Sequence, residues 1–323
     1  MRPRDLLVIA AAAVLAVGRL AGPVAAQAWP DKPVKVIVPF APGGGTDTVA
    51  RPWADKLTEV FGQPFVIDNR GGAAGVIGTE AVAKSPPDGY TLLIVGNSLL
   101  ALQPQLRKTP YDPIKSFMPA GYLGEVVAGF AIHPAVGVKT FAEMVAYAKK
   151  NPGKLAYGSA GLGGSTQMRI EMLKLRAGID ILHVPYRGSG DALADLLANN
   201  VQMMNEIVLN PHVKAGKLIM LAMSHSSRHP EFPDVPTLTE LGIKDADVPI
   251  WFAIYAPAGT PQGIVDRLNA KVVEIARVEE MQKRLAQISV VGAVKSVEEL
   301  TKFLADDIAL NGEVIKAANV KLD

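Results

Sequence analysis

Cysteine is absent from this chain of 323 residues. Its absence excludes a disulfide framework, thiol catalysis and a lipid-modified cysteine anchor. Stability must therefore come from the hydrophobic core, and hydrophobic residues make up 49% of the chain, which is ample for large cores. The length favours about two domains.

An excess of basic charge is also missing. Residues 1–28 hold three of the 33 lysines and arginines and one of the 31 acidic residues, so the rest of the chain has 30 of each sign. Proteins that bind nucleic acid usually present a basic patch. The balanced charge therefore gives no indication of a nucleic-acid partner.

No apolar run is long enough to span a membrane comfortably, but residues 1–28 have the features of a secretory signal peptide. Arg2 and Arg4 precede the apolar run Leu6–Val17, and Ala26–Ala28 is a small-x-small cleavage site. The alternative is a transmembrane anchor, which needs roughly 20 apolar residues. With no lipid site and no later membrane segment, we expect a soluble exported protein in the periplasm of a bacterium.

After the leader, short apolar runs alternate with helical patterns, which predicts α/β domains with right-handed crossovers. Several runs are continuously apolar, as in parallel strands covered on both faces. The predicted strands are Val34–Val38, Phe65–Ile67, Thr91–Val95, Leu155–Tyr157, Ile181–Val184, Lys217–Met223 and Trp251–Ala256, with a further one at Val201–Met204.

Capping signals mark where several helices begin and end. The pairs Thr140 with Glu143, Thr237 with Glu240 and Ser296 with Glu299 have the capping-box spacing, and Thr260 is followed by a proline suited to the first helical position. Gly178 and Gly242 stand where glycines end helices.

Two glycine-rich loops each follow a strand and precede a helical pattern. The first is Gly43–Asp47, ahead of Val49–Val60, and the second is Gly158–Thr166, ahead of Met168–Leu175. Glycine lets the backbone approach a ligand, and a helix N-terminus offers unpaired N–H donors, so such loops can hold an anion without a cationic side chain. Ligands of open α/β sheets bind at the carboxyl ends of strands, so two domains can close on one small molecule.

An ordered set of short motifs resembles the Bug-type solute-binding receptors of tripartite tricarboxylate transporters. The set spans essentially the whole mature chain, which makes it far more specific than any one string. Its members are Trp29–Pro33, Pro39–Gly44, Asp68–Arg70, Gly75–Gly78, Ala83–Leu92, His183–Gly188, Pro233–Thr237 and Ala256–Pro261.

The resemblance implies a two-domain periplasmic-binding-protein fold of the type II-like α/β class with an interdomain cleft. Domain 1 would comprise residues 29–122 plus 251–323, and domain 2 residues 123–250. Members similar to this chain bind small carboxylates, often through ordered waters and loop backbone groups, and water-mediated bonds can be nearly as favourable as direct ones. The implied partners are a small organic acid and the membrane permease subunits, and we expect a monomer.

Candidate ligand-binding residues in the first half come from the first loop and the next strand end. In the loop, glycine N–H groups and a threonine hydroxyl would bind the ligand, and Phe40 would form either a wall of the site or part of the core. Asp47 would repel a carboxylate, so first-turn capping is favoured over a bond to a bridging water. For Asn97, a ligand contact and a local turn bond are both open. The residues are Phe40, Pro42, Gly43, Gly44, Thr46, Asp47, Asn97 and Ser98.

Candidate residues in the second half follow the same logic. The second loop supplies hydroxyls and helix N–H groups through Ser159, Gly161, Gly164, Ser165 and Thr166. Tyr186 and Arg187 lie at another strand end, where Arg187 could pair with a carboxylate or form an interdomain or surface pair. Glu206 either lines the site, favouring a ligand with an amino or hydroxyl group, or faces solvent.

Three functional classes remain in view: a transport receptor, a receptor for a signalling partner, and a secreted α/β hydrolase. The chain contains no complete G-x-S-x-G, P-loop, dinucleotide or H-E-x-x-H motif. His225 and His229 have a metal-like spacing but lack the further ligands that zinc needs. We therefore expect a non-enzymatic receptor with no catalytic residues, no cofactor and no metal.

Overall fold

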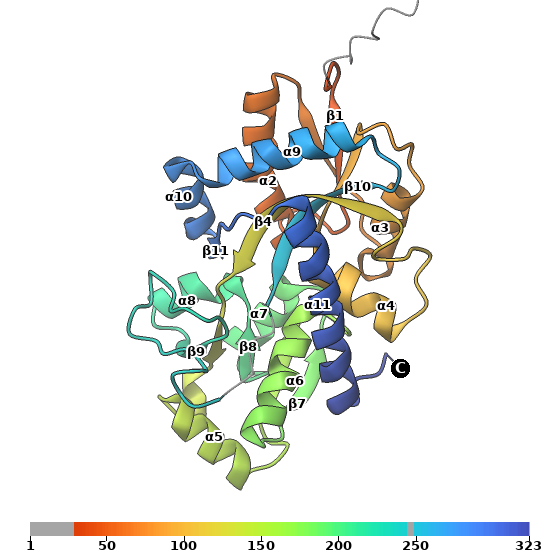
Figure 1. Ribbon diagram of the computed structural model, residues 1–323. Helices are drawn as coiled ribbons and strands as arrows, with labels where there is room; N and C mark the ends of the chain where they lie inside the picture. The colour runs from red at the N-terminus through yellow and green to blue at the C-terminus, as the bar shows by residue number, and fades with distance from the viewer. Residues whose placement is uncertain (1–28, 244–248, 323) are drawn as a thin grey trace, which may run out of the picture.

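The structure is a computed structural model that describes residues 29–243 and 249–322. The predicted signal peptide lies outside the described residues. Within them, no helix combines the length and the apolar character needed to cross a membrane. The chain forms two lobes, each built on its own β-sheet (Figure 1).

Lobe 1 contains a six-stranded sheet in the order β11-β4-β10-β3-β1-β2. The central strands are buried on both faces because α2 and α9 pack against the sheet together with α3. The strands are β1 (Val34–Val38), β2 (Phe65–Asn69), β3 (Thr91–Gly96), β4 (Phe117–Val126), β10 (Trp251–Pro257) and β11 (Val290–Val291). The helices are α2 (Gly45–Phe61), α3 (Val76–Ala83), α9 (Gln262–Ala276) and α10 (Glu279–Gln287).

Lobe 2 contains a five-stranded sheet in the order β7-β6-β8-β5-β9. Its strands are β5 (Gly129–Ile132), β6 (Ala156–Ser159), β7 (Leu182–Pro185), β8 (Met203–Asn205) and β9 (Ile219–Met223). Its helices are α5 (Phe141–Lys150), α6 (Ser165–Ala177), α7 (Ser189–Leu197) and α8 (Asn210–Lys214), and the short turn η4 (Ile207–Leu209) precedes α8.

Both sheets are mixed rather than parallel throughout. β1 pairs in parallel with β2 and β3, but β10 runs antiparallel to both β3 and β4. In lobe 2, β6 is parallel to β7 and β8, whereas β5 is antiparallel to β8 and β9. Continuous apolar runs reflect burial on both faces, which mixed sheets of this kind also provide. The expectation of α/β lobes is therefore confirmed, and parallel pairing holds for only part of each sheet.

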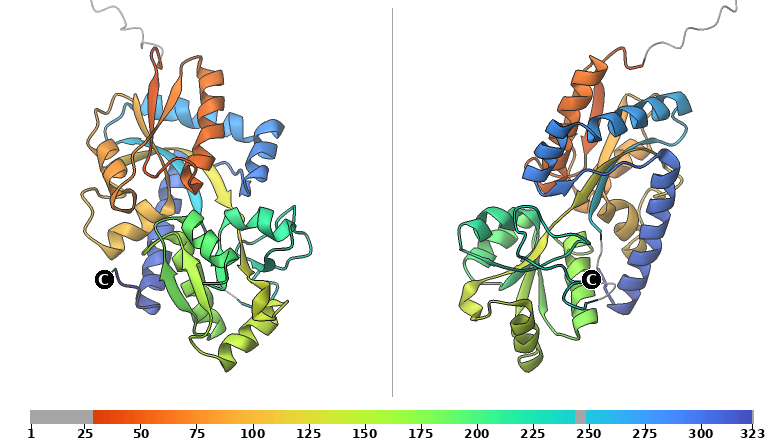
Figure 2. Two further views of the ribbon diagram at one scale, coloured as in Figure 1. Left: turned by 180° about the vertical axis from the view of Figure 1, so that it is seen from behind. Right: turned by 60° about the vertical axis from the view of Figure 1, so that its left-hand side comes forward.

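The chain crosses between the lobes where β4 leads into β5, and it returns before β10. The helix α11 (Val297–Ala317) then runs alongside both lobes, as Figures 1 and 2 show from three directions. Its Leu300 and Leu304 pack in the lobe 1 core with Trp251, while Val314 packs in the lobe 2 core. The last helix therefore joins the two cores.

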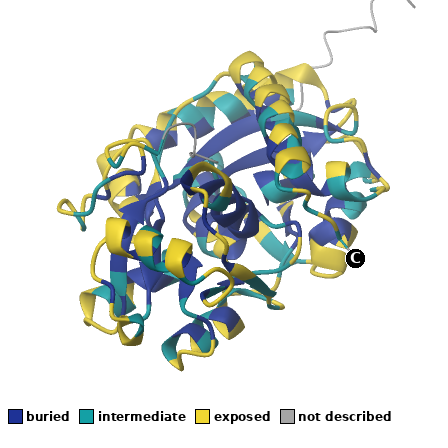
Figure 3. Cartoon of the chain, turned by 90° about the horizontal axis from the view of Figure 1, so that it is seen from below, coloured by how far each residue is buried: buried dark blue, intermediate teal, exposed yellow. Residues whose placement is uncertain are grey.

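Residues in the strands are mostly buried, and the outer helices expose only their outward faces (Figure 3). The helix α2 illustrates the cause, because Val49, Trp53 and Leu57 recur at helical spacing and face the sheet with no exposed surface. The two sheets thus hold the loops that follow their strands in fixed positions.

Two of the four predicted helix starts have the expected caps. Thr140 and Ser296 form complete capping boxes with Glu143 and Glu299. Thr237 and Glu240 also exchange both bonds, at 3.2 and 2.7 Å, but the chain turns at residues 237–242 without forming a helix. The prediction of a helix there is wrong, because Gly242 at φ 80° ends the turn after a few residues.

The prediction for Thr260 is wrong in detail. Its hydroxyl donates back to the carbonyl of Pro257 at 2.8 Å, and Pro261 is the residue that precedes the first turn of α9. The other end signal behaves as expected, because Gly178 ends α6 in the left-handed conformation at φ 62°.

Candidate functional site

The first glycine loop is organised by the side chain of Asp47. Its Oδ2 accepts from the Gly43 amide and from Arg51 Nε, both at 2.8 Å, and its Oδ1 accepts from Asn69 Nδ2 at 3.0 Å. Burial works against the charged carboxylate, but the bonds from Arg51 and Gly43 outweigh burial and hold the pKa of Asp47 below its ordinary value. The Asp47 side chain is thus bonded within and beside its own loop.

The helix α2 begins without a side-chain cap. Its N-cap residue is Gly44, and the amides of Gly45, Thr46 and Asp47 donate to no acceptor within the described part of the protein. By contrast, α5 and α11 satisfy their first amides with capping boxes. The open amides give this loop unpaired donors and partial positive charge.

Phe40 and Pro42 lie on the approach to that helix. The Phe40 ring is half-buried and packs against the lobe 1 core, where its Cζ would lie 3.0 Å from a Cβ placed on Gly75. Its carbonyl accepts from Asn69 Nδ2 at 3.0 Å. Pro42 is exposed. The core role foreseen for Phe40 is therefore present, and a ligand contact stays a prediction.

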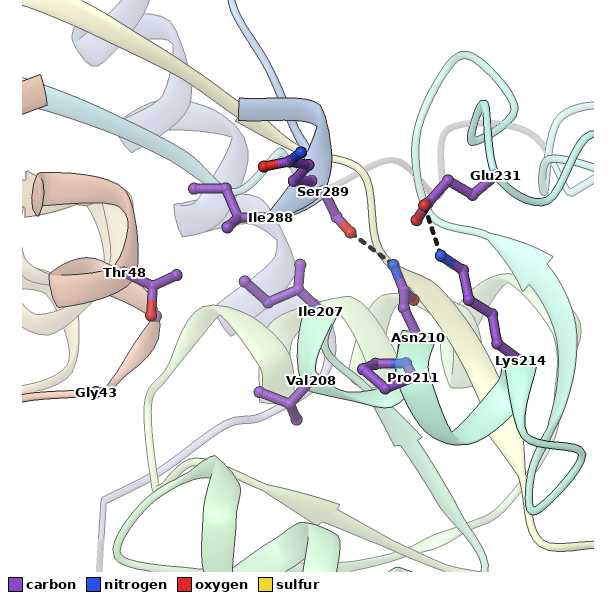
Figure 4. A pocket seen from close by; sticks show the side chains of 12 residues that line it. Gly43, Thr48, Ile207, Val208, Asn210, Pro211, Lys214, Glu231, Ile288 and Ser289 are labelled. Carbon is purple, nitrogen blue, oxygen red and sulfur yellow. Dashed lines mark hydrogen bonds and ion pairs between the residues drawn. The ribbon is translucent and has the colours of Figure 1, made fainter. Parts of the chain in front are cut away.

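A cavity of about 300 Å³ lies between the two lobes, beside the first loop (Figure 4). Lobe 1 lines it with Gly43, Gly45 and Thr48, and lobe 2 faces them with Ile207 and Val208. Lys214 and Glu231 form an ion pair of 2.5 Å at one side. The other lining residues are Asn210, Pro211, Gln287, Ile288 and Ser289.

Only Gly43 among the predicted residues lines this cavity. The other lining residues come from α2, from the η4–α8 segment, from the loop after β9 (Glu231) and from the end of α10 with the two residues that follow it. Ile207 and Val208 have no polar chemistry that would mark them, and no spacing along the chain links the four segments. Sequence reasoning had no signal for them beyond the neighbouring Glu206.

Ser165 and Asn97 meet across the boundary between the lobes. The Ser165 hydroxyl donates to Asn97 Oδ1 at 2.7 Å, while Asn97 Nδ2 donates to the carbonyl of Pro249 at 2.8 Å. Nearby, Gln103 of α4 (Gln103–Leu106) donates to the carbonyl of Gly163 at 3.2 Å. The second glycine loop is therefore held against lobe 1, and its serine is already bonded to a protein group.

Ser159 forms a second polar pair, with His183. The Ser159 Oγ lies 2.7 Å from His183 Nε2 and 3.1 Å from the Gly161 carbonyl, to which it donates. The imidazole stacks on Tyr157 with 4.7 Å between centroids. Burial lowers the pKa of His183 to about 4, so the ring is neutral at physiological pH.

A serine beside a histidine can act as a nucleophile with its base, but this chemistry needs a third group to orient the imidazole. Across the described residues, no carboxylate bonds to the other ring nitrogen of His183. The geometry of the pair instead fixes Ser159 within its own loop.

The rest of the second loop resembles the first. Thr166 Oγ1 accepts from the Ala160 amide at 3.3 Å, and Gly164 precedes α6 without a side-chain cap. The amides of residues 165–167 donate to no acceptor in the segments that the structure describes. Both predicted loops therefore place open helix N-termini in the boundary region.

The remaining candidates mostly bond within lobe 2. The Tyr186 hydroxyl donates to Asp195 at 2.6 Å, and Arg187 is exposed without an ion pair to any described residue. Glu206 accepts from the Ile207 amide and from Ser189 Oγ at 3.1 and 2.8 Å, and burial raises its pKa. Ser98 is half-buried at the start of η2 (Ser98–Leu102).

The buried arginine Arg169 was not singled out from the sequence. Arg169 on α6 has no exposed surface, and it donates to Asn205 Oδ1 at 3.2 Å and to the Val126 carbonyl at 3.1 Å. Asn205 in turn donates to Ser224, whose hydroxyl donates to the Ala128 carbonyl. This network fixes the crossing from β4 to β5. Because α6 also carries Glu171, Lys174 and Arg176, nothing in the sequence distinguished Arg169 from an exposed charged residue.

Comparison with known proteins decides the family. The model of the tripartite tricarboxylate transporter family receptor matches residues 49–320. This chain belongs to that receptor family. It is 35% identical to the protein BugT of Bordetella pertussis over 315 residues, covering 95% of this chain and 96% of BugT. The resemblance to Bug-type receptors is confirmed.

Solved structures of similar receptors have the same two-lobed fold. A protein from R. palustris solved with adipate has a TM-score of 0.85 at 33% identity, covering 91% of this chain and 99% of that one. MatC of Rhodopseudomonas palustris, solved with bound malate, has a TM-score of 0.80 at 30% identity, covering 89% and 100%. The predicted periplasmic-binding-protein fold class of this receptor is thereby confirmed.

Proposed function

We propose that this receptor binds a small organic acid between its lobes and delivers it to the permease of a tripartite tricarboxylate transporter. The observation that supports this most directly is the uncapped start of α2, whose first residue, Gly45, lines the cavity together with Ile207 and Val208. Amide donors suit a carboxylate, and the apolar wall suits the carbon skeleton behind it.

The ligand class follows from the relatives and from the charges near the cavity. Two similar proteins were solved with adipate and with malate, both dicarboxylates. In this chain the only cation lining the cavity, within the described residues, is Lys214, and it is paired with Glu231. Recognition therefore depends on backbone amides, hydroxyls and bridging water rather than on an arginine clamp.

Transport requires no chemistry at the site. Ligand that touches both lobes shifts the equilibrium from open to closed, and its differential affinity is sufficient for the change. We therefore propose a receptor without turnover, exported to the periplasm, that acts as a monomer. The same site would also serve a receptor that reports ligand to a signalling partner, and only the partner would differ.

A thermal-shift screen of the purified protein against a library of organic acids tests the proposal. A bound acid at 100 times its Kd stabilises the native state by about 2.7 kcal/mol, which raises Tm measurably. We expect hits among small carboxylates and unchanged ligand after prolonged incubation, followed by chromatography. A chemical product from any hit would favour the hydrolase instead.

A further inference from the structure

Among the described residues that line the cavity, one hydrogen bond joins the two lobes. Asn210 Nδ2 donates to Ser289 Oγ at 2.6 Å, as Figure 4 shows. Asn210 begins α8 in lobe 2, and Ser289 stands between α10 and β11 in lobe 1. Both residues are buried, with 6% and 4% of their surface exposed. The bond therefore exists only while the lobes are together.

The backbone of Ser289 is held rigidly on its own side. Its amide donates to the Ala286 carbonyl at 2.9 Å, and its carbonyl accepts from the Val127 amide at 2.8 Å, at the crossing between the lobes. Its φ of 59° lies in the left-handed region, which is unfavourable for a residue with a side chain. Glycine would suit this backbone better, so what serine adds here is its hydroxyl.

The Asn210–Ser289 bond can affect ligand binding because of where it lies. Ser289 is attached to the crossing, so a change in the angle between the lobes moves it relative to Asn210. Both residues also line the cavity, next to Ile207 and Ile288. A bond that stabilises the closed form raises the fraction of protein able to retain ligand, and apparent affinity scales with that fraction.

We propose that Asn210 and Ser289 are positioning residues that latch the lobes closed and slow the release of ligand. The proposal rests on the proposed function, because it assumes that an organic acid occupies the cavity. The bond between an amide and a hydroxyl is neutral, so its loss should accelerate dissociation about three- to tenfold, the effect of one buried hydrogen bond.

Three variants separate a latch from an ordinary structural contact. Ser289→Gly removes the hydroxyl and relieves the left-handed φ, so it should weaken closure without lowering Tm. Asn210→Ala removes the donor. In Asn210→Asp the carboxylate can accept a hydrogen bond from the Ser289 hydroxyl, so a bond between the lobes is kept. This variant is measured only without ligand, because its negative charge would repel a bound organic acid. Asn151→Ala is the control, since it removes an Asn Nδ2 bond of 3.0 Å to Tyr147 within lobe 2.

Two measurements test the latch on the full protein. The chain has no cysteine, so Lys84→Cys in lobe 1 and Lys149→Cys in lobe 2 allow clean spin labelling at exposed sites. Double electron–electron resonance without ligand measures the distance between the two spin labels. This distance should be longer in Ser289→Gly and Asn210→Ala than in wild type, and unchanged in Asn210→Asp and Asn151→Ala. Stopped-flow release of adipate, or of malate if adipate does not bind, should be faster in the first two variants.

The two proposals fail in different ways. If the wild-type protein binds neither adipate nor malate, the proposed ligand class is contradicted. The distances between the spin labels without ligand would still test the latch. Distances that are the same in Ser289→Gly, Asn210→Ala and wild type would overturn the latch, as would a Tm loss in Ser289→Gly that accounts for its faster release.

Discussion

His183 illustrates how one residue can tie protonation to stability. In the folded protein burial lowers its pKa to about 4, whereas the unfolded value is about 6.5. Between these values the unfolded chain binds a proton that the native state does not. The contribution of His183 is therefore complete above about pH 6.5 and is lost as the pH falls towards 4.

The variant His183→Gln should remove that dependence. Allowing for the partial exposure of the ring, we expect His183 to account for about 2 kcal/mol of the free energy of unfolding that the wild-type protein loses between pH 7.5 and 4.5. Glutamine can still donate to Ser159, so the loop should persist. Urea unfolding at several pH values measures how the free energy of unfolding changes with pH. A variant that loses as much of this free energy as wild type on acidification would contradict the role assigned to His183.

Arg169 and Arg187 are two arginines with opposite surroundings. Replacing buried Arg169 with methionine would leave the Asn205 side chain and the Val126 carbonyl without a donor. Each unsatisfied buried acceptor costs about 1–3 kcal/mol, so we expect Arg169→Met to lower the free energy of unfolding by about 3 kcal/mol.

Exposed Arg187 supplies the matched control. Arg187→Met should change the free energy of unfolding by less than about 0.5 kcal/mol, as is usual at the surface. Urea titration of both variants distinguishes them, and equal losses would show that the hydrogen bonds of Arg169 do not stabilise the crossing. Weaker ligand binding in Arg187→Met would instead support the predicted contact with a carboxylate.

At the scale of elements, the left-handed glycines near the two ends of α6 differ in what surrounds them. A Cβ on Gly163 would lie 2.7 Å from Leu106 Cδ1 and 3.0 Å from Gln103 Nε2, across the boundary between lobes. A Cβ on Gly178, which has a similar φ, would meet open space. A side chain at residue 163 would therefore have to displace the side chain of Leu106 as well as adopt the left-handed conformation.

These two glycines give a paired prediction. Gly178→Ala should cost about 1 kcal/mol, the penalty for a left-handed residue with a side chain. Gly163→Ala should cost about 1–3 kcal/mol more, because overpacking adds to the same penalty. Thermal and urea unfolding compare them, and equal losses would mean that the loop moves away from Leu106 without difficulty.

Elements were predictable where their pattern is local. The strand at Val34–Val38 and the capping boxes at Thr140 and Ser296 were read correctly from neighbouring residues. β4 and β5 were not foreseen, because their runs contain glycine and proline and gain stability from partners far along the chain. At Thr237 the predicted bonds with Glu240 are present, but no helix follows them, so a local pattern can be right while the element predicted from it is wrong.

At the scale of the whole molecule, α11 packs in the cores of both lobes, so we expect them to unfold as one unit. Its first half packs in lobe 1 and Val314 packs in lobe 2. All three tryptophans, Trp29, Trp53 and Trp251, lie in the lobe 1 cores, so their fluorescence reports that lobe alone. Far-ultraviolet circular dichroism reports both lobes.

We expect the two signals to change together in urea. Val314→Ala should lower stability by about 2 kcal/mol through lost burial in lobe 2, and the tryptophan signal in lobe 1 should shift with it. A variant in which circular dichroism shifts while fluorescence stays in place would show that the lobes unfold independently.

The sequence by itself determined the family, the α/β class and the two glycine loops, because these depend on motifs and periodicity along short stretches of chain. Only the tertiary structure decided that Asn97 bonds to Ser165 and that Ile207 and Ser289 share a cavity with Gly43. The physical reason is distance along the chain. These contacts join segments tens to hundreds of residues apart, and their geometry follows from how two sheets and α11 pack rather than from any local preference.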